Sequence, residues 1–101
     1  MSNQQKQNTM ITRENLMAEL SAKYPKMFLR TTEEFDGGEG GIWSSGEDGL
    51  EDEEGLPLFS YYSEAHSLYE FGVRIPLAKW LAERGWYAEW HDAGTIMLYE
   101  D

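Results

Sequence analysis

The stretch that decides the fold is Trp86-Tyr87-Ala88-Glu89-Trp90-His91, then Asp92-Ala93-Gly94, then Thr95-Ile96-Met97-Leu98-Tyr99. Two runs of apolar and aromatic residues separated by Asp and Gly turn chemistry predict a β-hairpin with a three-residue loop. Alternation along the first run puts Trp86, Ala88 and Trp90 on one face. We therefore expect a C-terminal β-hairpin whose indole rings pack against the helices.

The residues before this hairpin predict a helix. Pro76 suits the first turn of a helix, and Leu77, Trp80 and Leu81 follow with the spacing of one helical face. Gly85 then supplies a left-handed stop. The chain is thus expected to enter the hairpin directly from a helix.

Two further helices are expected nearer the N-terminus. Thr12 offers a hydroxyl cap to a helix whose apolar positions are Leu16, Leu20 and Tyr24, and Pro25 ends it. A second, short helix is expected from a Ser63 cap through Leu68 to Phe71, where Gly72 ends it.

Three other segments have the composition of strands. They are residues 27–32, 41–45 and 58–62, and in the second of them Ile42 or Trp43 is expected to fix the surrounding glycine-rich loop to the core. Together the segments predict an α+β fold: a small antiparallel sheet of three to five strands, two or three helices packed on one face, and the C-terminal β-hairpin.

The length of 101 residues suits one domain. Residues 1–10 are polar and rich in Gln and Asn, which predicts a disordered N-terminal arm, whereas residues 11–101 form a single α+β domain with an acidic, Gly-rich loop at 36–55. The chain has no cysteine, which excludes a disulfide framework and a thiolate zinc site. It also has no apolar run of membrane-spanning length and no signal-peptide pattern, so we expect a cytoplasmic protein.

Charge is distributed unevenly along the chain. The formal net charge is -11, and the window from Thr31 to Val73 holds twelve carboxylates with no Lys or Arg. An ordinary surface intersperses both signs, so this segregation predicts a folded negative face that meets a basic protein surface. Such a face could imitate the phosphates of nucleic acid. The alternative is a solvated face that only keeps the protein soluble.

Exposed aromatic side chains near the acidic rim would anchor such a partner. Trp43, Phe59, Tyr61 and Tyr62 are the candidates, each with core packing as its alternative role. The predicted partner-binding residues are Glu33, Glu34, Asp36, Glu39, Trp43, Glu47, Asp48, Glu51, Asp52, Glu53, Glu54, Tyr61 and Tyr62.

No pattern in the chain predicts catalysis or a cofactor. The carboxylates at 47–54 lack the order of an EF-hand loop, and His66 and His91 have no supporting motif. The glycines at 37–41 lack the Lys and Ser or Thr of a phosphate-binding loop, and no basic groove is present to follow a nucleic-acid backbone. We expect a non-enzymatic protein with no metal, no cofactor and no direct contact to nucleic acid or membrane.

A resemblance covers roughly the last thirty residues. The residues that carry it are Gly72-Val73, Leu77, Trp80-Leu81, Arg84-Gly85-Trp86-Tyr87, Glu89-Trp90, Asp92-Ala93-Gly94-Thr95 and Met97-Leu98-Tyr99. This pattern resembles the C-terminal part of small uncharacterised acidic proteins of phages and mobile elements. The resemblance implies a host-cell setting in which anti-CRISPR and anti-restriction proteins block defence nucleases, and it carries over no functional residue.

Two other functions remain open at this point. An immunity protein that neutralises a nuclease toxin would use the same electrostatics. An accessory or assembly protein would instead pair the edge strand of its hairpin with a larger protein or with a second copy, as a homodimer.

Overall fold

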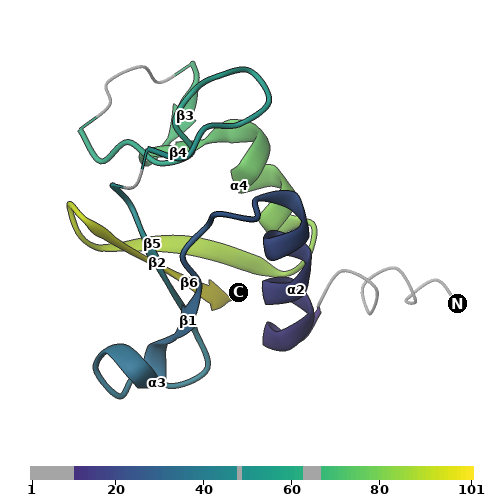
Figure 1. Cartoon of the computed structure of the whole chain (residues 1–101), viewed down its shortest axis with the longest axis vertical. Coiled ribbons are helices and arrows are strands. Elements are labelled where there is room, and N and C mark those ends of the chain that lie inside the picture. Colours follow the sequence, from purple (N-terminus) through teal and green to yellow (C-terminus); the bar gives the residue numbers. More distant parts are fainter. Residues whose placement is uncertain (1–10, 48, 63–66) are drawn as a thin grey trace, which may run out of the picture.

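The computed structural model describes residues 11–47, 49–62 and 67–101. At its centre lies a four-stranded antiparallel sheet in the order β1-β2-β6-β5, and a two-stranded sheet, β3-β4, lies apart from it (Figure 1). The described elements are α2 (Arg13–Lys23), β1 (Arg30–Thr31), α3 (Thr32–Phe35), β2 (Ile42–Ser45), β3 (Tyr69–Glu70), β4 (Val73–Arg74), α4 (Ile75–Ala82), β5 (Trp86–Asp92) and β6 (Thr95–Glu100). The predicted α+β class is confirmed.

The predicted C-terminal hairpin is present as β5 and β6. Asp92 pairs with Thr95, so the loop is the two residues Ala93 and Gly94 rather than the predicted three. The Asp92 carboxylate accepts a hydrogen bond of 3.0 Å from the Gly94 backbone N–H, which fixes the turn. A bulge between Trp90 and Asp92 shifts the register near the end of β5.

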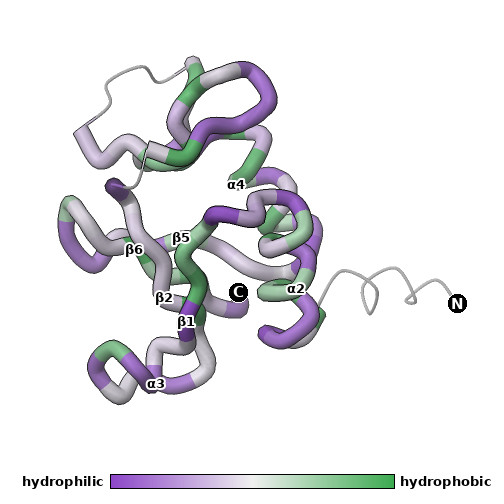
Figure 2. The backbone as a smooth tube through the Cα atoms, in the orientation of Figure 1, coloured by the Kyte–Doolittle hydropathy of each residue, from purple (hydrophilic) through white to green (hydrophobic). Residues whose placement is uncertain are grey.

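The two longer helices cover one face of the large sheet. Leu16 and Leu20 of α2 are fully buried, and Leu77 and Leu81 of α4 are nearly so. α2 combines hydrophobic with strongly hydrophilic residues, so only one side of it enters the core (Figure 2). On the sheet, the core side chains belong to β2, β5 and β6 and include Ile42, Trp86, Ile96 and Leu98.

The predicted start and end signals of α2 and of α4 are confirmed. The Thr12 hydroxyl accepts a hydrogen bond of 3.1 Å from the Asn15 N–H at the start of α2, and Pro25 follows its last residues. α4 has Pro76 in its first turn, and Gly85, at φ 81°, provides the left-handed residue after it.

The short helix α3 was not predicted, and it shortens the first strand from residues 27–32 to Arg30–Thr31. The Thr32 hydroxyl donates to the Gly38 carbonyl at 2.9 Å and accepts from the Gly41 N–H at 3.1 Å, which closes the following glycine loop. The Phe35 ring lies 4.8 Å from the Trp43 ring, on the side of the sheet opposite the core. Two helices, not all three, therefore share one face.

The strand predicted at 58–62 is wrong, because that segment makes only an isolated bridge between Phe59 and Val73. The helix predicted up to Phe71 is also wrong where the structure describes it: Tyr69 and Glu70 form β3, and the Phe71-Gly72 turn leads into β4. Phe71 and Gly72 both have positive φ, which is the conformation of a type I′ hairpin turn and cannot continue a helix. Residues 63–66 and the expected arm at 1–10 lie outside the described residues.

Candidate functional site

The described carboxylates of the acidic window do not form one face, which corrects the central expectation from the sequence. Those with ion pairs are divided between α3 and the neighbourhood of β4, which lie at opposite ends of the long axis (Figure 1), and Glu47 lies beside Gly94 of the β5-β6 turn. At both ends, cations from outside the window form ion pairs with five of these carboxylates. The ion pairs are Arg13–Glu33 at 2.7 Å, Arg30–Glu34 at 3.2 Å, Lys23–Glu53 at 3.3 Å, Arg74–Asp52 at 2.6 Å and Arg74–Glu54.

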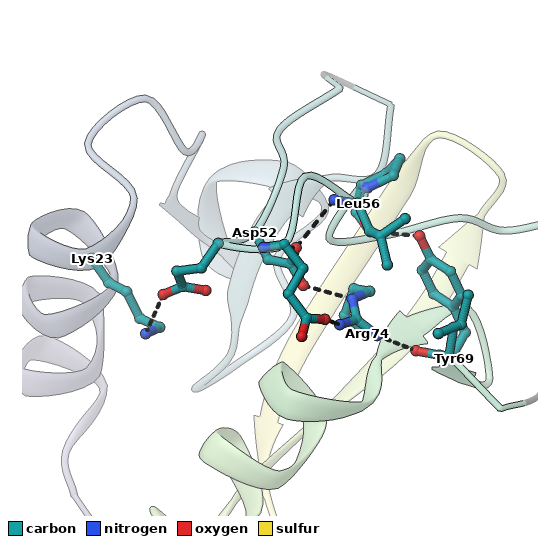
Figure 3. Close-up of polar contacts among 9 residues, drawn as sticks. Lys23, Asp52, Leu56, Tyr69 and Arg74 are labelled. Atoms are coloured by element: carbon teal, nitrogen blue, oxygen red, sulfur yellow. Dashed lines mark hydrogen bonds and ion pairs between the residues drawn. The ribbon is translucent and has the colours of Figure 1, made fainter.

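Arg74 organises the end of the molecule near β4 (Figure 3). Its side chain is 3% exposed; Nε donates to Asp52 Oδ2 at 2.6 Å, and Nη1 donates to the Leu68 carbonyl at 2.6 Å. Asp52 Oδ1 accepts from the backbone N–H groups of Glu54 at 2.9 Å and Leu56 at 3.1 Å. Asp52 is thus a structural residue of a closed loop, and its carboxylate is 5% exposed.

The pKa directions follow from these contacts. Burial alone would raise the pKa of Asp52, but hydrogen bonds from Arg74 and from the backbone of Leu56 and Glu54 outweigh it and lower the pKa. The same bond to Asp52 raises the pKa of Arg74, so both members of the pair stay charged. Burial, and next the nearby Glu53 carboxylate, raise the pKa of Tyr24 to about 12.

Glu33 and Glu34 also have structural duties. Glu33 accepts hydrogen bonds from the Gly40 N–H at 3.0 Å and from Arg13, and these contacts, the backbone bond first, lower its pKa to about 2. Glu34 accepts from the Thr31 N–H at the start of α3 and pairs with Arg30, which lowers its pKa. Both carboxylates remain partly exposed, and each forms an ion pair with an arginine.

A different set of carboxylates is exposed and has no ion pair among the described residues. It keeps four of the predicted site residues and adds several from the hairpin and its surroundings. The set is Glu14, Asp36, Glu39, Glu47, Glu51, Glu70, Glu89, Asp92, Glu100 and Asp101. The hairpin members could have been found from the sequence, because residues 85–101 also contain no Lys or Arg.

The predicted aromatic anchors divide into two groups. Trp43 is half-buried against Phe28, whose ring centroid is 5.0 Å away, and Phe59 is 8% exposed, so both serve packing. Tyr61 and Tyr62 are 46% and 80% exposed. The Tyr61 ring lies 5.0 Å from the Tyr62 ring and 5.0 Å from the ring of Trp90 in an edge-to-face arrangement, which keeps this pair on the surface.

Besides Tyr87, which is 43% exposed, Phe71 is an exposed aromatic residue that was not among the predicted anchors. Its side chain is 89% exposed and its φ is 51°, a conformation that a bulky residue seldom adopts. The Trp90 Nε1–H donates to the Phe71 carbonyl at 2.8 Å, and the Ser60 N–H donates to the Gly72 carbonyl at 2.8 Å. The signal available in the sequence was Phe-Gly between two short β-favouring segments.

Beside Phe71 lies a groove of about 280 Å³. Its walls come from α4, from the β3-β4 turn and from the start of β5, and among the described lining residues there is no Lys or Arg. The lining residues are Glu70, Phe71, Val73, Ala78, Leu81, Ala82, Trp86, Tyr87, Ala88 and Asp101. An apolar floor with Glu70 and Asp101 at its margin suits an apolar group that is flanked by positive charge.

The remaining predicted site residues are spread over the surface. Asp36, Glu39, Glu47 and Glu51 are exposed, and Asp48 lies outside the described residues. Of the histidines, His91 is exposed with its ring 4.9 Å from Phe35, and His66 lies outside the described residues.

Within the described residues, no three potential metal ligands come together, and no helix has both the length and the apolarity needed to cross a membrane. Comparisons with protein-family models, with curated proteins and with solved structures found no match to this chain.

Proposed function

We propose that the protein is a non-catalytic inhibitor that binds the basic nucleic-acid-binding surface of a host defence protein, as anti-CRISPR and anti-restriction proteins do. The observation that supports this most directly is the margin of the groove. There, Glu70 and Asp101, which have no ion pair within the described part of the chain, accompany the exposed rings of Phe71 and Tyr87, and the described residues that line the groove include no cation. We call these four residues the acidic–aromatic rim.

The two kinds of side chain in the rim have different roles. Exposed carboxylates on a protein of net charge -11 raise the rate of encounter with a basic surface, typically by a factor of about ten to a thousand at low salt. Steering alone gives weak complexes, whereas aromatic rings held on the surface supply the apolar contact that slows dissociation. Tyr61 and Tyr62, held beside Trp90, extend this aromatic surface.

The proposal differs from the expectation of a continuous imitation of DNA. Five of the predicted carboxylates form ion pairs within the protein, so we do not assign them to the binding surface. They are Glu33, Glu34, Asp52, Glu53 and Glu54. Positive charge on the partner would instead interact with the carboxylates of the rim and with the other carboxylates of the hairpin that have no ion pair among the described residues. A smaller patch of this kind competes with nucleic acid by occupying part of the partner's groove rather than all of it.

The test is inhibition of DNA binding by purified CRISPR effectors, restriction endonucleases and nuclease toxins, followed by fluorescence anisotropy of a labelled duplex. We expect inhibition of at least one defence protein, lost as salt is raised and lost in the double variant Glu70→Lys, Asp101→Lys. Glu14→Lys is the matched control, since Glu14 is exposed and unpaired but lies on α2, and it should inhibit as the unchanged protein does.

Two results would overturn the proposal. One is the absence of inhibition across the defence proteins, and the other is inhibition that neither salt nor the double variant affects. Inhibition confined to a nuclease toxin would replace the defence protein by a toxin and make the protein an immunity protein.

A further inference from the structure

We infer that the free edge of β5 and the groove beside it bind an extended peptide segment of a partner protein, one in which basic and apolar side chains alternate. The segment would add to the large sheet as a new strand. This inference deepens the proposed function and depends on it for the sign of the partner's charge, while the strand-like binding mode comes from the following geometry.

The first observation is the position of β5 at the end of the sheet. In the order β1-β2-β6-β5 it has β6 on one side and, among the residues that the structure describes, no strand on the other. An edge strand presents unpaired backbone N–H and C=O groups, and natural proteins usually cover or interrupt such an edge. The interruption here is the bulge between Trp90 and Asp92, which leaves the preceding residues of β5 regular.

The second observation fixes which backbone groups face outward. The Asp101 N–H donates to the Gly85 carbonyl at 2.8 Å, so Gly85 and Asp101 are a hydrogen-bonded pair. Such pairs recur at every second residue of an antiparallel ladder, which makes Tyr87 and Glu89 the next residues bonded to β6. The backbone groups of Ala88 therefore point away from β6, and within the described residues they receive no hydrogen bond from another segment.

The third observation is that the groove lies along this edge. Trp86, Tyr87 and Ala88 of β5 line it together with Ala78 and Leu81 of α4. An added strand would place alternate side chains on opposite faces of the sheet. On the core side, an apolar side chain would enter the groove against Leu81 and Val73, with the exposed Phe71 ring over it.

The fourth observation decides the occupant. On the other side of the added strand, the neighbouring side chains are Tyr87 and Glu89, and Glu70 and Asp101 lie at the groove margin. Basic side chains at alternate positions of the segment would meet Glu89 there, and the negative charge of Glu70 and Asp101 at the groove margin would attract the same segment. A second copy of the chain is the less favourable occupant. Pairing two β5 strands would bring Glu89 and the groove carboxylates of one copy close to the same carboxylates of the other, and the two copies, each of net charge -11, would repel each other.

The probe is the synthetic peptide Lys-Val-Lys-Leu-Lys-Val-Lys with blocked ends, added to the isotope-labelled protein. We expect amide chemical-shift changes along β5 and slowed hydrogen exchange at the Ala88 amide. Phe71→Gly should weaken binding roughly tenfold, the loss of about one aromatic contact. That variant keeps a residue that accepts positive φ, so the turn is expected to fold. Leu68→Ala, which shortens an exposed apolar side chain that does not line the groove, is the control and should leave the affinity unchanged.

Three results would overturn the inference. These are no binding at millimolar peptide, binding that leaves the β5 amides unperturbed, and equal affinity for the same peptide with proline in place of the central leucine. A dimer that forms with rising protein concentration and protects the Ala88 amide would assign the edge to a second copy instead. If Phe71→Gly retains inhibition while Glu70→Lys with Asp101→Lys loses it, the proposed function stands and strand addition fails.

Discussion

The indole Nε1–H of Trp90 in β5 donates a hydrogen bond of 2.8 Å to the backbone carbonyl of Phe71 in the β3-β4 turn. The indole also packs close to Gly72, where an added Cβ would lie 2.9 Å from Nε1. One side chain of the large sheet thus holds both residues of a turn that belongs to the small sheet. This contact keeps Phe71 at φ 51° although the ring itself is exposed.

Phe71→Gly should therefore leave the protein as stable or make it more stable by up to about 1 kcal/mol. The left-handed conformation costs a non-glycine residue on the order of 1 kcal/mol, which glycine avoids, while glycine's greater freedom in the unfolded chain offsets part of the gain. The measurement is the free energy of unfolding in urea. Destabilisation by more than about 1 kcal/mol would show instead that the ring contributes to packing.

Asp52→Ala should lower the free energy of unfolding by roughly 2 kcal/mol, because it leaves the buried Arg74 guanidinium without its buried partner and frees two backbone N–H groups. For a chain of this size the melting temperature would fall by about 10 °C. Glu51→Ala, at an exposed neighbouring residue without an ion pair, is the control and should change little. Equal stability of the two variants would contradict the structural role of Asp52.

Glu33→Gln should reduce stability at neutral pH and cease to matter in acid. The pKa of Glu33 is lowered to about 2 from 4.5, so the folded state favours the charged form. The resulting stabilisation is present above pH 4.5 and is lost as the pH falls through that value towards 2. Urea midpoints of both proteins, measured from pH 7 downwards, should converge over that interval. A difference that stayed constant into acid would refute this linkage.

Gly41→Ala should destabilise the protein by about 2 kcal/mol or more. An added Cβ would lie 2.5 Å from Tyr99 Cε1 and 2.9 Å from the Leu98 carbonyl oxygen, so β6 and the glycine loop cannot both keep their positions. Thermal unfolding monitored by circular dichroism would measure this loss. Adding Tyr99→Ala should recover part of it, and no recovery would indicate that the backbone contact with Leu98 dominates.

The local patterns predicted the elements that local physics determines. Thr12 as a cap, Pro76 in a first turn and Gly85 as a left-handed stop each act within one or two turns of backbone, and all three are confirmed. The strand predicted at 58–62 failed because aromatic content favours any half-buried position. The rings of Phe59 and Tyr61 pack against Trp90, and their segment does not form a strand.

The charge pattern could not predict the site, because the cations that neutralise the window come from distant parts of the sequence. Arg13 lies 20 residues from Glu33, and Lys23 lies 30 residues from Glu53. A window of sequence without Lys or Arg therefore does not define a surface without them. Tyr61 and Tyr62, for which the sequence left both packing and anchoring open, are exposed. The groove depends on how α4 and the β3-β4 turn meet β5, which no local pattern encodes.

The strand order β1-β2-β6-β5 has a consequence for synthesis on the ribosome. β2 and β5 contact each other only through β6, the strand that is translated after both. A nascent chain that has reached Gly94 thus holds two outer pieces of the sheet with nothing to join them. Folding of the large sheet must wait until residues 95–100 have left the exit tunnel, and until then the apolar sides of β2 and β5 depend on chaperones or on α2 and α4 for cover.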